Sequence, residues 1–153
     1  MITKPFVGVL LMMCAGAASA AAAAAAAVPE CVTLSQGWVR LPPSPTATPM
    51  TAGYGVIRNG CSTAVAIIGA RSASFGDVSL HETRIVDGVS RMRAVERLPL
   101  APGERAVLKP GGLHLMLMDG RRVLEEGQPV WLQVQLEGGT EVSTALIVRK
   151  AAP

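Results

Sequence analysis

Two residues near the middle of this chain have types and a spacing that could bind a soft metal ion. His114 and Met116 follow a turn signal at Pro110–Gly112 and alternate with leucines at positions 113, 115 and 117. Because residues i and i+2 of a strand point to the same face, the pattern predicts an imidazole beside a thioether. The leucines would then face a core, and the pair would lie near a strand end.

The second histidine, His81, is followed after ten residues by Met92, and twenty-one residues then precede His114. A turn signal at Asp87–Gly88 predicts a hairpin that brings His81 and Met92 onto neighbouring strands. Two imidazoles and two thioethers are four neutral donors, and thioether sulfur favours Cu(I). Zinc would prefer cysteine or a third histidine, and Mg²⁺ or Ca²⁺ would need carboxylates. A blue-copper site would need a cysteine beside His114, where none is present.

The complete spacing, His-x10-Met-x21-His-x-Met, resembles the bacterial periplasmic copper chaperones of the PCu(A)C family. The resemblance extends over roughly residues 34 to 150. Further matching segments are Gly37-Trp38-Val39-Arg40, Ala52-Gly53-Tyr54, Leu80-His81-Glu82, Gly88-Val89 and Leu124-x-x-Gly127. The chain departs from the pattern at Thr83, where many relatives have a methionine outside the four-residue motif.

The resemblance implies that His81, Met92, His114 and Met116 hold one Cu(I) per chain at an exposed end of the domain. It also implies a periplasmic monomer that delivers copper to an acceptor in respiratory oxidase assembly, at the CuA centre. Alternatives are copper sequestration or tolerance, and an exported β-sandwich interaction module in which these residues are structural. The sequence shows neither the paired carboxylates nor the Ser-His-Asp arrangement that would predict an enzyme.

Short apolar segments separated by turn signals predict an all-β Greek-key sandwich in one domain, and the resemblance implies a cupredoxin-like version. Met50 is expected in a proline-rich loop, Met118 as core filler, and Pro99–Gly103 as a loop. The expected strands are 34–40, 53–58, 64–71, 78–86, 89–95, 104–108, 113–118, 129–137 and 141–148.

Residues 1–27 have the pattern of a secretory signal peptide, which leaves 28–153 as the exported domain. Lys4 precedes an apolar segment, and Ala18–Ala20 fits a small-x-small cleavage site. We expect cleavage and no stable membrane insertion afterwards. The alternatives are an uncleaved anchor over residues 5–28, which is long enough to span a bilayer, and lipidation at Cys14.

Cys31 and Cys61 remain after removal of such a leader, and an even pair in an exported protein predicts a disulfide. A redox-active or copper-binding dithiol is the alternative for this pair. The formal net charge of +3 is too weak and too scattered to predict nucleic-acid binding.

Overall fold

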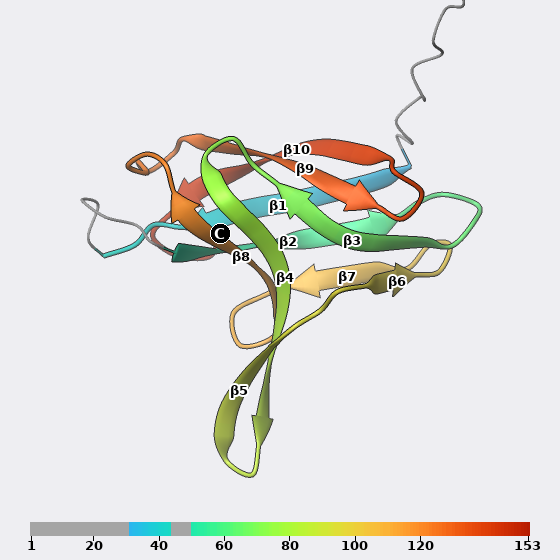
Figure 1. The fold of residues 1–153 in the computed structure, drawn as a ribbon, viewed down its shortest axis with the longest axis horizontal. Helices are drawn as coiled ribbons and strands as arrows, with labels where there is room; N and C mark the ends of the chain where they lie inside the picture. The colour runs from blue at the N-terminus through green and yellow to red at the C-terminus, as the bar shows by residue number, and fades with distance from the viewer. Residues whose placement is uncertain (1–30, 44–49) are drawn as a thin grey trace, which may run out of the picture.

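A computed structural model of the protein describes residues 31–43 and 50–153 (Figure 1). Within them the chain is all-β, which confirms the fold class predicted from the sequence. No helix in the described part is long and apolar enough to cross a membrane. The predicted signal peptide, with Cys14, lies outside the described residues. The strands are β1 (Val32–Arg40), β2 (Met50–Asn59), β3 (Val65–Arg71), β4 (Phe75–Val86), β5 (Val89–Ala94), β6 (Leu98–Leu100), β7 (Arg105–Leu108), β8 (Leu113–Gly120), β9 (Pro129–Leu136) and β10 (Glu141–Arg149).

These strands form one sheet that closes on itself. Their order is β5-β4-β8-β2-β1-β10-β9-β3-β6, with β7 also paired to β2 and an additional pairing of β3 with β4. The β3–β4 pairing joins the two halves of the sheet, so the strands enclose one core in a flattened barrel (Figure 1). Aliphatic side chains fill that core, among them Val39, Leu117, Leu146 and Val148, which are fully buried.

Strand β4 belongs to both the barrel and a hairpin. Its first part pairs with β8, and its last part pairs with β5 in a hairpin that projects from the body of the domain (Figure 1). Asp87 and Gly88 form the two-residue turn, with φ angles of 52° and 76°. Two successive positive φ values are typical of a type I′ hairpin turn, so the turn predicted from the sequence is confirmed.

Two strands include residues that were predicted to lie in loops. Met50 begins β2, because the backbone there pairs with β8 and sets Met50 opposite Met118. Leu98–Leu100 forms β6, which pairs with β3 although Pro99 lies at its centre. Because β6 is the last strand of the sheet order, the missing N–H of this proline leaves no inner ladder broken.

A disulfide joins Cys31 to Cys61, whose Cα atoms are 4.9 Å apart, and closes a chain segment with a sequence separation of 30. It links the residue before β1 to the turn after β2. The buried Asn59 beside it accepts a hydrogen bond from the backbone N–H of Cys61 at 2.9 Å and donates to the carbonyl of Leu100 at 3.0 Å. This end of the barrel is therefore held by a covalent bond and by a buried amide.

We predict that the Cys31→Ser, Cys61→Ser double variant folds but is less stable. A cross-link over a loop of this length should contribute about 3 to 4 kcal/mol through the entropy of the unfolded chain. The melting temperature, measured by circular dichroism, should therefore fall by roughly 10 °C. Reduction of the wild-type protein should lower it by the same amount, whereas equal melting of all three samples would contradict a stabilising role.

Candidate metal centre

The two histidines form a directly opposed pair across neighbouring strands. The antiparallel register of β4 and β8 sets His81 opposite His114, and their ring centroids lie 6.2 Å apart at an interplanar angle of 29°. Both side chains point to the outer face of the sheet, which we define as the face of β4, β8 and β2 opposite the core leucines. His114 is only 6% exposed, and His81 is partly buried.

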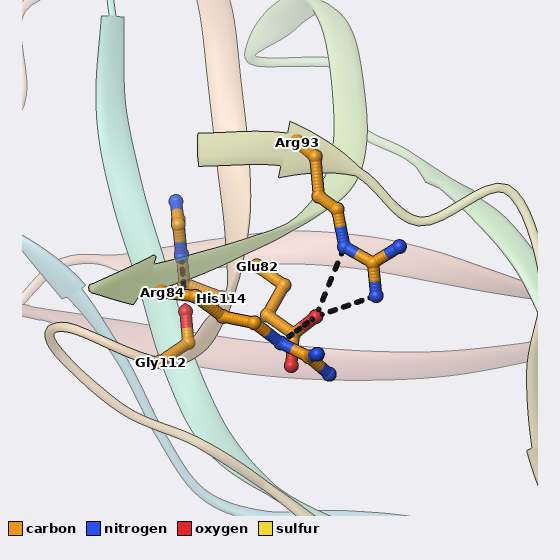
Figure 2. Close-up of polar contacts among 5 residues, drawn as sticks. All are labelled: Glu82, Arg84, Arg93, Gly112 and His114. Carbon is orange, nitrogen blue, oxygen red and sulfur yellow. Dashed lines mark hydrogen bonds and ion pairs between the residues drawn. The ribbon is translucent and has the colours of Figure 1, made fainter. Parts of the chain in front are cut away.

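The backbone carbonyl of Gly112 orients the His114 ring (Figure 2). Nδ1 of His114 lies 2.8 Å from this oxygen, which also accepts the backbone N–H of Thr83 at 3.1 Å. Because a carbonyl oxygen only accepts hydrogen bonds, Nδ1 must carry the proton. In the neutral ring Nε2 then keeps its lone pair, which is the arrangement found in metal-binding histidines.

His81 has a buried polar atom without a partner. Its Nδ1 makes no hydrogen bond to any group in the described part of the chain. An unsatisfied buried polar atom costs about 1 to 3 kcal/mol, unless a ligand supplies the missing interaction. A metal ion bound between the two imidazoles would satisfy this need, so the donor set fits a cation.

Met116 lies beside this pair on the same face. It is two residues from His114 on β8, is 9% exposed, and pairs with Ser79 on β4 and with Ala52 on β2. The register therefore brings His81, His114 and Met116 together over the barrel.

Met92 is also on the outer face but lies on the hairpin. Met92 pairs with Thr83, so it is a diagonal neighbour of His81. The Cα atoms of diagonal neighbours lie about 7 to 8 Å apart. Its side chain is 54% exposed. The site thus differs from the exposed one expected from the sequence, because His114 and Met116 are buried while Met92 is open to solvent.

Glu82, the strand neighbour of His81, points away from the site. Its carboxylate pairs with Arg84 and with Arg93, both at 2.9 Å (Figure 2). Hydrogen bonds from Arg84 and then from Arg93 hold the pKa of Glu82 below its ordinary value. No group of three or more His, Cys, Asp or Glu side chains that could hold a metal occurs among the described residues. The Met116 thioether is a further donor that the strand register brings to the face of the histidine pair.

Sequence reasoning missed the aromatic residues that lie next to His114. The ring centroid of Tyr54 is 6.5 Å from that of His114 and 4.5 Å from that of Trp38, and the Arg40 guanidinium lies 5.8 Å from the Tyr54 centroid. Both aromatic side chains are buried, and Tyr54 lies between Trp38 and the imidazole, so it shields one side of His114 from water. The signal was present as two aromatic residues on adjacent expected strands. No residue type in the sequence indicates that the backbone carbonyl of Gly112 orients the imidazole.

The chain matches a family that is described as "Putative lipoprotein LpqE-like", over residues 32–148. A protein of Leifsonia xyli subsp. xyli (strain CTCB07) named "Putative lipoprotein Lxx21020" is 31% identical over 121 residues. The alignment covers 77% of this chain and 69% of that protein. These names suggest that the protein is exported.

Solved structures of PCuAC domains have the same fold. The apo PCuAC domain from PmoF1 has a TM-score of 0.64 at 20% identity, covering 79% of this chain and 95% of that domain. The copper-bound PCuAC domain from PmoF2 has a TM-score of 0.64 at 22% identity, with 82% and 97% covered. The Cu(I) form of DR1885 from Deinococcus radiodurans has a TM-score of 0.61 at 25% identity, with 83% of each chain covered. The cupredoxin-like fold and the PCuAC resemblance predicted from the sequence are confirmed: the chain has the fold of PCuAC domains, and it belongs to the LpqE-like family.

Proposed function

We propose that this protein is a copper chaperone that binds one Cu(I) through His81, Met92, His114 and Met116. The observation that supports this most strongly is the opposed histidine pair. One ring is oriented by the Gly112 carbonyl so that Nε2 is free, and the other has a buried Nδ1 without a partner. A buried thioether lies beside the pair. The proposal is one of binding and transfer, not of catalysis.

The charge of the donor set favours the monovalent ion. Two imidazoles and two thioethers are neutral, so they leave the charge of a divalent cation uncompensated, and thioether sulfur selects Cu(I). The carboxylate next to His81 along β4, that of Glu82, lies on the opposite face and is paired with two arginines. Asp77 shares the outer face, but it lies opposite Met118, beyond the four proposed ligands. Two of the similar structures, the PmoF2 domain and DR1885, were solved with copper or Cu(I) bound, which supports copper as the cargo.

The difference in burial among the four residues suits a carrier that releases its ion. Met92 is the most exposed of them, so an incoming thiolate or thioether of an acceptor could replace it first. His114 and Met116 hold the ion from the barrel until the acceptor has supplied further ligands. A protein whose role was to sequester copper would gain nothing from an exposed ligand. We therefore favour delivery, and the resemblance to the PCu(A)C family is the reason for proposing the CuA centre of a respiratory oxidase as the recipient.

The proposed place of action is outside the cytoplasm, in the periplasm, with the chain acting as a monomer. The lipoprotein names of the family and of the relative agree with export. An exported location also agrees with a disulfide between Cys31 and Cys61, because such bonds persist in oxidising compartments.

We predict that the purified protein selects Cu(I) over Zn(II). Competition against a Cu(I) chelator should give one tightly bound ion per chain, since two of the four donors are soft sulfur atoms. A hundredfold excess of Zn(II) should leave the bound Cu(I) in place. Displacement of Cu(I) by an equal amount of Zn(II) would contradict the donor set.

Removal of each proposed ligand should weaken Cu(I) binding without unfolding the domain. His114→Ala, His81→Ala and Met116→Leu should each raise the Kd by more than about 100-fold, because even partners that only orient a ligand are worth 10- to 100-fold. Met92→Leu should have a smaller effect on the Kd. Val89→Leu on the same hairpin is the matched control, and the less stable Cys31→Ser, Cys61→Ser variant should still bind one ion. Wild-type affinity in His114→Ala would overturn the assignment.

The recipient is tested by a transfer assay. The Cu(I)-loaded protein should pass its ion within minutes to the apo form of a CuA-bearing oxidase domain. After oxidation, the absorption of the assembled centre measures this transfer. Met92→Leu should lower the transfer rate by a larger factor than it raises the Kd, because the exposed thioether is proposed to be replaced first. Retention of Cu(I) in the presence of excess apo acceptor would favour sequestration instead.

A further inference from the structure

All four methionines of the described residues lie on the outer face, together with both histidines. Strand β8 carries His114, Met116 and Met118 at alternate positions, so their side chains follow one another along that face. The β2–β8 register sets Met50 directly opposite Met118. Met92 extends the series on the hairpin. Soft donors thus continue past the proposed site, toward the end of β8 where Met50 lies.

The Met50–Met118 pair has the geometry of a thioether site. Opposed residues of antiparallel strands have Cβ atoms about 4.5 to 5.5 Å apart, and the unbranched methionine side chain is flexible enough to turn its sulfur toward a shared ion. Met116 is the next residue on the same face, and its partner on β2 is Ala52. Met116 and Met118 are neighbours on one face of β8, so Met116 is the thioether next to this pair.

The surroundings of this pair favour a cation. Asp77 on β4 is the partner of Met118 on the other side of β8, so a carboxylate lies on the same face. Its Oδ2 accepts a hydrogen bond from Ser79 at 3.2 Å. Met50 is 55% exposed, so it contributes little to the core and is open to an incoming ion. Met118 is partly exposed, whereas Met116 is buried, so burial increases from Met50 toward the histidines.

We propose that Met50 and Met118 form a second, weaker Cu(I) position that shares Met116 with the main site. The inference rests on the proposed function in taking Cu(I) as the cargo, but binding to this thioether group does not require the histidines. An ion would move between the positions by ligand exchange without change of oxidation state. On entry, bonds to His81, Met92 and His114 form as the bonds to Met50 and Met118 break, while Met116 stays bound. At equilibrium the main site fills first, and the weaker position fills second.

The test is a Cu(I) titration of the purified protein with ¹³C-labelled methionine methyl groups, observed by NMR under anaerobic conditions. The first equivalent should shift the Met92 and Met116 signals. The second equivalent should shift those of Met50 and Met118. Met50→Leu, Met118→Leu should abolish the second phase and leave the first Kd within about twofold. The matched control is Ile68→Leu, which changes an exposed strand residue away from this face. Unmoved Met50 and Met118 signals at three equivalents would overturn the proposal.

A His81→Ala, His114→Ala variant separates this proposal from the proposed function. If the thioether position exists, Met50 and Met118 should respond to the first equivalent of Cu(I) in this variant, because the stronger competitor has been removed. In the wild type, shifts of the Met50 and Met118 signals without a shift of the Met92 signal would support the second site and contradict the main one. A first phase that shifts Met92 and Met116 while the Met50 and Met118 signals stay unmoved would support the main site and contradict the second one. Zn(II), run in parallel, should shift none of the four methyl signals.

Discussion

The proposed metal site depends on the register in which β4 pairs with β8. This register sets His81 opposite His114 while Leu80 and Leu115, the next residues on each strand, point into the core. A slip of one residue would turn every side chain of the slipped strand to the other face. It would expose a buried leucine and bury an imidazole among aliphatic side chains. Burial of the leucines therefore holds the two histidines in place, so the site is specified by the same free energy that stabilises the fold.

Strand β4 crosses from a buried environment to an exposed one, and the proposed ligands follow it. His114 and Met116 are buried on the outer face of the barrel, with Tyr54 beside the imidazole, whereas Met92 belongs to a hairpin that projects from the domain (Figure 1). The barrel part orients its donors through packing and through the Gly112 carbonyl. The hairpin part leaves its donor accessible. Strand β4 thus joins the buried part of the proposed site, on β8, to its exposed part, on β5.

In the hairpin of β4 and β5, the alternation of side chains places the proposed soft donors and the Glu82–Arg93 ion pair on opposite faces. His81 and Met92 share the outer face, while Glu82 and Arg93, each one residue further along its strand, form an ion pair on the opposite face. The period of two therefore keeps the Glu82 carboxylate away from His81 and Met92, two of the proposed neutral ligands. This separation favours a monovalent soft ion, because no anionic donor of the hairpin is available to stabilise a divalent one.

Local patterns in the sequence were enough to predict several elements of this protein. The alternation of leucine with His114 and Met116 predicted β8, and Asp87–Gly88 predicted the hairpin turn, because strand period and turn chemistry are properties of neighbouring residues. Tertiary structure alone decided that β4 lies beside β8, that Gly112 orients an imidazole, and that Met50 belongs to β2. These features come from pairing between segments far apart in the chain. Their register is chosen by which faces the whole core can bury, and a local pattern does not contain that information.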